Sequence, residues 1–364
     1  MNYQQYNHQP NYYNQYNNPG YVQSPYPPNN YIYNRPVTQE DIERKKLNST
    51  MTGIGVLMIV AICVFFLFTI IFSVFYTLFL ENYSFSENYD TIAENLLTGI
   101  SNVLPIGACG FFYLIFRKQK VSEVLLFEKI GIKKLVSVIS IGFTVCMMAN
   151  LATGLFMEVS SSVGFNLDYS YDSPVSNSPL EVIVYLVSVA VVPSFSEEIL
   201  FRGAILSSLR KYGDGFAVMV SAFFFGLFHG NLIQFPFAMI VGIIQGWAFV
   251  YTNSLLPAII IHFLNNGFSV IMDVITTNAQ SAGISSNLID YIAYGLVIGL
   301  AFIALISAAY LSKKDKKFLT LTKYEGCLQK KEIKSALLTN PTIIIAFVLL
   351  AVETMMTHLA LYLL

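Results

Sequence analysis

Residues 193–203 read PSFSEEILFRG and place two adjacent carboxylates, Glu197 and Glu198, and the guanidinium of Arg202 at the end of a long apolar run. A charge near the centre of a membrane helix costs about 3 kcal/mol on insertion scales, so ionisable residues in such segments usually pair, face a wet cavity and carry function. The composition supports a membrane setting. Of the 364 residues, 55% are hydrophobic and only 12% are charged, a balance that a water-soluble domain would not keep off its surface.

Apolar segments of about the length that a membrane crossing requires recur along the chain. They lie at about residues 53–80, 96–116, 135–157, 182–200, 216–230, 235–251, 256–276, 289–311 and 342–363. The sequence therefore predicts an all-α polytopic membrane helix bundle with about eight to nine transmembrane helices. The segment at 216–230 is short for a full crossing, so we expect it to be tilted or extended into polar sequence. The fourth segment is expected to end at the Glu pair, with residues 204–209 as an apolar face at the membrane surface.

The distribution of Lys and Arg predicts the orientation. These residues gather at 35–46, 117–134, 202–211 and 313–334, whereas the links at 81–95 and 158–181 are acidic. Because Lys and Arg concentrate in cytoplasmic loops, the N-terminus is predicted to be cytoplasmic.

Four regions are predicted along the chain. Residues 1–48 form a disordered cytoplasmic tail rich in Tyr, Asn, Gln and Pro, residues 49–311 the membrane bundle, residues 312–340 a basic cytoplasmic link and residues 341–364 a C-terminal transmembrane helix. The tail is either a solvated linker or a Tyr-rich segment that associates with partners. The four cysteines have no CxxC spacing, which predicts neither a disulfide framework nor a zinc knuckle.

Three apolar segments each offer one polar cluster. Residues four apart share a face of an α-helix, which groups Glu198 with Arg202, Phe225 with His229, and His262 with Asn266. Glu198 and Arg202 are interpreted first as a structural ion pair. Glu197 points about 100° around the helix from Glu198, so it is freer to face a cavity and to act as a general base. The alternative is that both acids serve one charge network.

These groups could act on a water molecule with or without a metal ion. Imidazole, carboxylate and amide groups can bind a metal, or they can activate water and stabilise an oxyanion directly. The HExxH helix of common zinc proteases is absent. No cofactor is firmly implied, a divalent metal such as zinc stays open, and its candidate ligands are Glu197, His229 and His262. The simpler interpretation of His262 and Asn266 is an interhelical hydrogen bond.

Taken together, the three motifs resemble those of the CPBP family of intramembrane proteases, which includes the type II CAAX prenyl endopeptidases and the bacteriocin-processing or self-immunity proteins. The motifs are EExxxR at 197–202, FxxxH at 225–229 and HxxxN at 262–266, and the resemblance covers about residues 180–275. It implies peptide-bond hydrolysis in a cavity within a helical bundle. The bacterial look of this family branch also makes the plasma membrane of a bacterium the expected location. By this resemblance Glu197 and His229 would activate the attacking water, His262 and Asn266 would stabilise the oxyanion, and the supporting residues would be Glu198, Arg202 and Phe225.

The leading prediction is an intramembrane endopeptidase, of glutamic or metal-dependent type, that acts on a peptide or a membrane-anchored protein with a CaaX-like end or a leader peptide. The alternative is a non-catalytic immunity or peptide-binding scaffold protein. A transporter is disfavoured, because the polar constellation occurs once rather than in two repeated halves. The expected partners are the substrate and membrane lipid, without nucleic acid, and the oligomeric state stays open.

Overall fold

The computed structural model describes residues 36–80, 103–119, 127–164 and 178–363, together with isolated residues between 92 and 121. Most of the predicted tail lies outside these ranges. The described ranges are helical, apart from turns, short irregular links and one isolated β-bridge between Phe127 and Ser254. The all-α prediction is thus confirmed for the described part of the chain.

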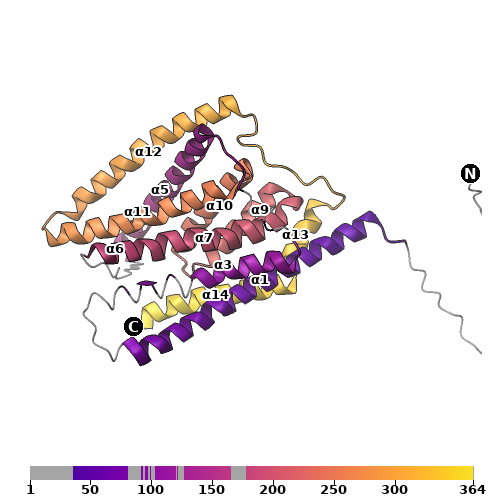
Figure 1. The fold of residues 1–364 in the computed structure, drawn as a ribbon, viewed down its shortest axis with the longest axis horizontal. Helices are drawn as coiled ribbons and strands as arrows, with labels where there is room; N and C mark the ends of the chain where they lie inside the picture. Colours follow the sequence, from indigo (N-terminus) through magenta and orange to yellow (C-terminus); the bar gives the residue numbers. More distant parts are fainter. Residues whose placement is uncertain are drawn as a thin grey trace, which may run out of the picture. The chain divides into compact units, whose positions relative to one another are not determined.

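The helices follow one another within the unit Gln39–Leu364 (Figure 1). In chain order they are α1 (Gln39–Phe75), which continues into the π-helical turn η1 (Tyr76–Leu80), α3 (Leu104–Phe116), α5 (Ile132–Ser162), α6 (Pro179–Leu186), η3 (Val187–Val191), α7 (Val192–Glu198), η4 (Ile199–Leu206), α8 (Ser207–Leu209), η5 (Arg210–Tyr212), α9 (Asp214–Leu227), α10 (Gln234–Thr252), α11 (Leu255–Ser281), α12 (Ser286–Lys314), α13 (Lys330–Leu338) and α14 (Pro341–Leu363). The helix α1 begins within the residues predicted for the tail, and α13 lies within the predicted basic link.

The number of membrane-spanning helices depends on two short ones. Among the described residues six helices are long and apolar enough to cross a membrane, and a seventh crossing results if α13 and α14, bent by 56° at their break, form one span. The helices α3 and α9 are apolar but have only 13 and 14 residues, whereas a full crossing needs about 20. The predicted eight to nine spans include these two, which explains why that number is somewhat higher.

The fourth predicted segment does not end at the Glu pair. Helical structure continues from Pro179 to Tyr212, over 34 residues, so Glu197 and Glu198 lie near its middle. Residues 200–206 are all buried, and the predicted apolar face at the membrane surface is therefore wrong. The π-helical turns η3 and η4 flank α7, and such wide turns are rare inside helices and frequent at functional sites.

This longer helix brings the Glu pair level with His229. The helix α9 begins at Asp214, whose carboxylate accepts a hydrogen bond from Arg210 near the end of the long helix, at 3.0 Å. At 1.5 Å per residue, the Glu pair and His229 both lie about 20 Å from this shared end. An unbroken α9 is therefore enough to bring the Glu pair and His229 to the same depth in the bundle.

Glycines allow α3 and α10 to approach their neighbours closely. A Cβ atom on Gly107 would lie 2.7 Å from the Cα of Ser196 in α7. In α10, a Cβ atom on Gly242 would lie 2.9 Å from the Cα of Ala222 in α9. Small residues are the usual means by which membrane helices pack backbone against backbone.

We expect Gly107→Ala to lower the stability of the bundle, because the added methyl group must displace the backbone of α7. Overpacking of this kind costs about 1–3 kcal/mol, which thermal unfolding of the purified protein in detergent would detect. The control is Gly154→Ala in α5, where no atom lies within 4 Å of the added Cβ. Equal melting temperatures of the two variants would contradict the close contact between α3 and α7.

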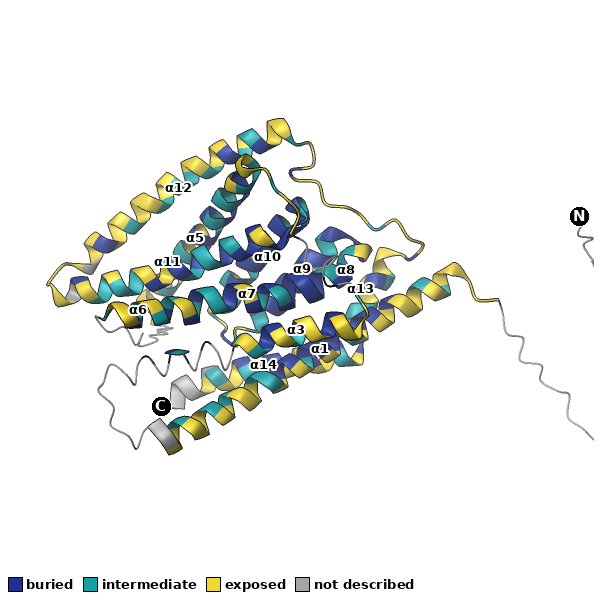
Figure 2. Ribbon diagram, in the orientation of Figure 1, coloured by how far each residue is buried: buried dark blue, intermediate teal, exposed yellow. Residues whose placement is uncertain are grey.

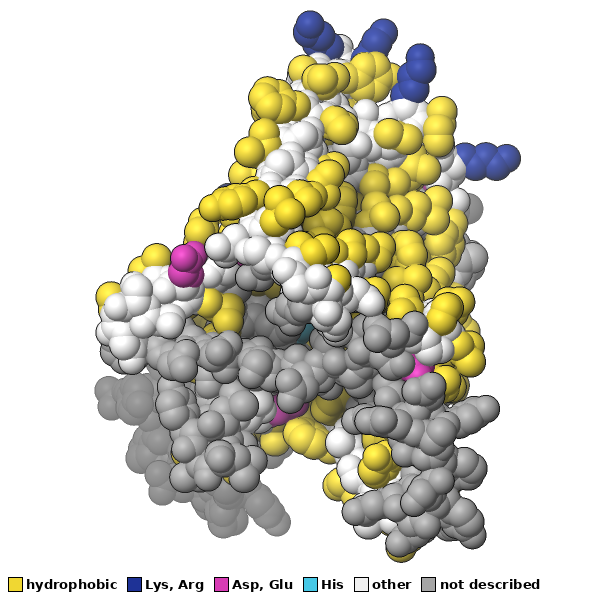
Figure 3. Space-filling model, turned by 90° about the vertical axis from the view of Figure 1, so that its left-hand side faces the viewer, with side chains coloured by type: hydrophobic (Ala, Val, Ile, Leu, Met, Phe, Trp, Pro, Cys, Tyr) yellow, Lys and Arg dark blue, Asp and Glu magenta, His cyan; other side chains and the backbone are white. Residues whose placement is uncertain are grey.

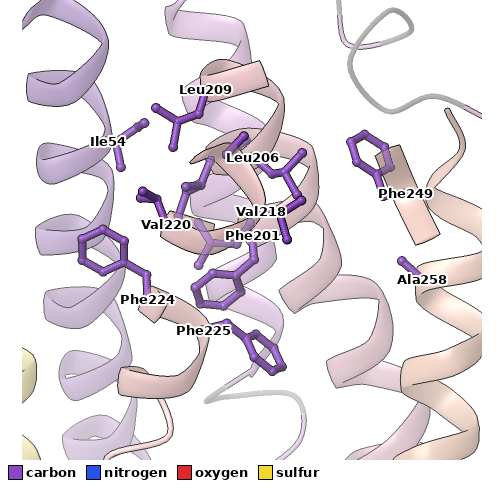
Figure 4. Packing of buried hydrophobic residues seen from close by; sticks show 14 of the residues in the cluster. Ile54, Phe201, Leu206, Leu209, Val218, Val220, Phe224, Phe225, Phe249 and Ala258 are labelled. Atoms are coloured by element: carbon purple, nitrogen blue, oxygen red, sulfur yellow. The ribbon is translucent and has the colours of Figure 1, made fainter. Parts of the chain in front are cut away.

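Buried residues concentrate on the helices that surround the Glu pair. Figure 2 shows α7, α8, α9 and much of α10 as largely buried, whereas α12 is exposed along most of its length. Figure 4 shows Phe201, Leu206 and Val218 pointing into one core. Figure 3 shows Lys and Arg side chains gathered at one end of the face in view, with hydrophobic side chains over most of its remaining described surface. Such apolar surface is suited to lipid.

Candidate active site

Arg202 is the centre of a buried hydrogen-bond network. Its side chain is fully buried, and its Nη1 donates to Oε1 of Glu198 at 2.8 Å. Its Nη2 donates to Oε1 of Gln245 at 2.6 Å and to the carbonyl oxygen of Gly242 at 3.2 Å. The guanidinium also lies over the ring of Phe225, 4.5 Å from its centroid. The predicted ion pair of Glu198 and Arg202 is therefore present, and α10 supplies the further acceptors that a buried charge requires.

His262 of α11 joins this network from the other side. Its Nδ1 lies 3.0 Å from Oε1 of Glu198. A carboxylate can only accept, so we assign the proton of this hydrogen bond to Nδ1 of His262. The second ring nitrogen, Nε2, lies 3.9 Å from Oε2 of Glu197, which is too long for a direct hydrogen bond. One imidazole thus approaches both carboxylates of the Glu pair.

The two adjacent acids differ in access. The side chain of Glu198 is 0% exposed, whereas that of Glu197 is 16% exposed. Glu198 receives hydrogen bonds from both Arg202 and His262, so its role is to hold the network together. Glu197 is the carboxylate that reaches accessible space, as expected from its different direction on the helix.

His229 reaches the cluster through an aromatic ring. Its Nδ1 donates to the carbonyl oxygen of Phe225 at 2.8 Å, because a carbonyl can only accept. In the neutral ring the other nitrogen, Nε2, then carries no proton. The ring of Phe225 contacts both imidazoles, with centroid distances of 4.9 Å to His229 and 5.8 Å to His262. No hydrogen bond or ion pair joins His229 to Glu197 within the described part of the chain. The structure therefore places His229 beside the Glu197 and His262 pair rather than in contact with it.

Asn266 bonds to the π-helical turn ahead of the Glu pair. Its Nδ2 donates to the carbonyl oxygen of Val189 in η3 at 3.0 Å, and its Oδ1 accepts from Nδ2 of Asn265 at 3.1 Å. It shares a helix face with His262. The amide thus fixes α11 against the helix that carries the carboxylates.

Sequence reasoning missed two polar residues of this region. Gln245 is fully buried and accepts from Arg202. Its signal was a primary amide inside the apolar segment at 235–251, which is costly without a partner. Asn265 accepts from Nδ2 of Asn150 in α5 at 3.4 Å. The spacing of four residues links Asn266 to His262 and gave no reason to single out the adjacent Asn265.

The described side chains do not form a conventional metal site. Within the described ranges no group of three or more His, Cys, Asp or Glu side chains could hold a metal ion. Of the three candidate ligands, Glu197 and His262 approach each other, whereas no hydrogen bond or ion pair joins His229 to Glu197 within the described ranges. Protein-bound zinc usually takes three or four such ligands, so the donor set does not fit one.

The cluster of Glu, His and Arg side chains lies within the part of the chain that resembles known proteins. Residues 179–268 match the family model described as Type II CAAX prenyl endopeptidase Rce1-like. Over 106 residues the chain is 30% identical to the membrane-embedded CAAX protease MroQ of Staphylococcus aureus (strain USA300). These matches and the three motifs make residues 179–268 similar to the CPBP family.

The matches are confined to the part of the chain that carries the cluster. The alignment with MroQ covers 27% of this chain and 43% of the relative, so the chain spans less than half of that protein's length. No solved structure matches the chain. The matched residues 179–268 contain all three motifs, whereas α1, α3, α5, α12 and α14 lie outside them.

Proposed function

We propose that the protein is an intramembrane endopeptidase that hydrolyses a peptide bond in a peptide or a membrane-anchored protein. The observation that carries the proposal is the accessible carboxylate of Glu197, which faces Nε2 of His262 at 3.9 Å while Arg202 and His262 hold the neighbouring Glu198. The family match and the similarity to MroQ, which is named as a CAAX protease, support it. The proposed substrates carry a CaaX-like end or a leader peptide.

Glu197 would act as the general base. The attacking water would hydrogen-bond to both Oε2 of Glu197 and Nε2 of His262, which lie 3.9 Å apart, too far for a direct hydrogen bond. As the water oxygen attacks the carbonyl carbon of the substrate, Glu197 takes its proton. The same carboxyl group then donates this proton to the amide nitrogen as the carbon–nitrogen bond breaks, which leaves a carboxylic acid and an amine. Proton transfer from the acid to the amine then gives the carboxylate and the ammonium products.

The histidines would take complementary roles. The free Nε2 of His229 can accept a hydrogen bond from the attacking water, since Nδ1 carries the proton. With a proton on each ring nitrogen, His262 would donate from Nδ1 to Glu198 and from Nε2 to the oxyanion. Asn266 would position α11 for this contact through its hydrogen bond to Val189. This glutamate-based scheme routes no step through a metal.

The test compares the peptides of cells that express wild type, Glu197→Gln or His229→Gln at matched levels, by mass spectrometry. We expect a set of cleaved peptides to appear with wild type and to disappear with both variants. The matched control is Glu158→Gln, an exposed carboxylate of α5 away from the site. An unchanged peptide set in both variants, with the proteins present and folded, would contradict proteolysis and support a peptide-binding scaffold instead.

We also propose that the protein lies in the plasma membrane of a bacterium with its N-terminus in the cytoplasm. The basic link before α13 contains Cys327, whose side chain is exposed. A membrane-impermeant maleimide should label Cys327 only after the cells are permeabilised, and Cys327→Ser should remove that signal. Labelling of Cys327 in intact cells would reverse the orientation.

A further inference from the structure

The helix α14 carries a carboxylate that the proposed reaction does not use. Its sequence from Pro341 to Leu363 contains Glu353 and no Asp, Lys or Arg. A single acid in an otherwise apolar membrane helix is costly and is commonly retained for function. The helix lies outside the family match at 179–268, so the motifs give no role to Glu353.

The carboxylate of Glu353 lies against the turn that follows His229. The helix α14 runs beside α9, where the rings of Phe347 and Phe223 stack with centroids 6.1 Å apart. Further along, a Cβ atom on Gly230 would lie 3.4 Å from Oε1 of Glu353 and 3.6 Å from its Cδ. Gly230 adopts a positive φ of 61° and directly follows His229. Glu353 therefore covers the backbone next to one of the proposed catalytic side chains.

Polar groups at this turn lack partners. Within the described part of the chain the carboxylate of Glu353 has no hydrogen-bond or ion-pair partner. Asn231 is 3% exposed, and its Nδ2 is buried without an acceptor. The Oδ1 of Asn231 is already occupied by the backbone N–H of Ile233, at 2.8 Å. An unpaired acceptor and an unpaired donor thus flank Gly230.

The turn beside Glu353 favours a positive charge. It lies at the C-terminal end of α9, where the helix dipole is negative and attracts cations. The side chain of Glu353 is half-buried. A ligand that brings a cationic nitrogen would supply the partner that its carboxylate lacks.

We propose that Glu353 forms a substrate-binding subsite that recognises a cationic nitrogen close to the scissile bond. The cation is a Lys or Arg side chain or the free amino terminus of the substrate. Because Gly230 is adjacent to His229, the cation lies within about two residues of the cleaved bond, at about 3.3–3.6 Å per residue. This inference rests on the proposed function and gives it a substrate preference.

The test sorts the peptides that depend on Glu197 by their sequence around the cut. In Glu353→Gln, we expect cleavage next to a Lys, an Arg or a free amino terminus to fall about tenfold or more, because a charge-assisted hydrogen bond is lost. Cleavage without a nearby cation should change little. In Glu353→Lys, the preference should move to Asp and Glu.

Synthetic peptides copied from the cleaved sequences distinguish the two sources of the cation. One form replaces Lys or Arg by norleucine, and the other acetylates the amino terminus. The source is the group whose removal slows wild type about tenfold but leaves Glu353→Gln unaffected. The control variant is Thr357→Val, one turn further along α14, whose Oγ1 donates only to a backbone carbonyl of its own helix, at 3.0 Å.

The outcomes separate this inference from the proposed function. An unchanged peptide set in Glu197→Gln would overturn both. Glu197-dependent peptides whose sequences and amounts are the same in wild type and Glu353→Gln would overturn the subsite and leave the protease intact. An equal loss of all cleavage in Glu353→Gln, with or without a cation near the cut, would make Glu353 a structural residue and would also overturn the subsite.

Discussion

Arg202→Met is expected to destabilise the protein by about 3–5 kcal/mol, the usual cost of removing one partner of a buried ion pair. The variant leaves the fully buried Glu198 without its cation, and it leaves Oε1 of Gln245 and the carbonyl of Gly242 without their donor. Thermal unfolding of the purified protein in detergent and the amount recovered from membranes would both report the loss.

The control removes the second charge. In Arg202→Met combined with Glu198→Gln, no buried charge is left unpaired, so we expect the double variant to recover at least half of the stability lost by Arg202→Met. Residues in direct contact are expected to show such non-additive effects. A double variant that melts no higher than Arg202→Met would show that the contacts to α10, rather than the ion pair, stabilise this region.

Glu197→Gln is expected to lower the rate of peptide hydrolysis by about 10³-fold, within the range that general acid–base catalysis contributes. The free energy of unfolding should change by about 0.5 kcal/mol or less, because Glu197 is partly exposed and its approach to His262, at 3.9 Å, is not a direct hydrogen bond. Turnover of a peptide identified in cells, measured beside thermal unfolding of the same preparation, gives both quantities.

Glu198→Gln provides the matched comparison for Glu197. It changes the neighbouring carboxylate, which is fully buried and accepts from two side chains, so stability should fall together with activity. Retention of more than a tenth of the wild-type rate in Glu197→Gln would show that another group removes the proton from water. Equal loss of stability in the two variants would contradict the division of roles between the two acids.

Hydrophobic runs and charge asymmetry were enough to predict the class of fold. The runs predict membrane helices because a helix of about 20 consecutive apolar residues is long enough to cross the hydrocarbon core of a bilayer. They do not reveal where a helix ends when apolar sequence continues past the charges, as it does from Leu200 to Leu209. The long helix extends to Tyr212. The Glu pair therefore lies near the middle of this helix, not at its end as predicted.

The site was predictable where it depends on a single helix. A spacing of four residues predicted the ion pair of Glu198 and Arg202, which the structure contains. Contacts between helices were not predictable in this way, because spacing along a chain carries no information on which side chains of separate helices meet. The hydrogen bonds of Glu198 to His262 and of Arg202 to Gln245 are of this kind.

The wide turns η3 and η4 also constrain how sequences of this kind should be aligned. A π-helical turn holds one more residue than an α-helical turn, so deletion of one residue from Val187–Val191 or Ile199–Leu206 can restore ordinary helix without rotating the downstream residues. A deletion within Val192–Glu198 would instead turn the carboxylates by about 100°. Single-residue gaps among relatives therefore belong in the two wide turns, and the seven residues between them should keep a constant length.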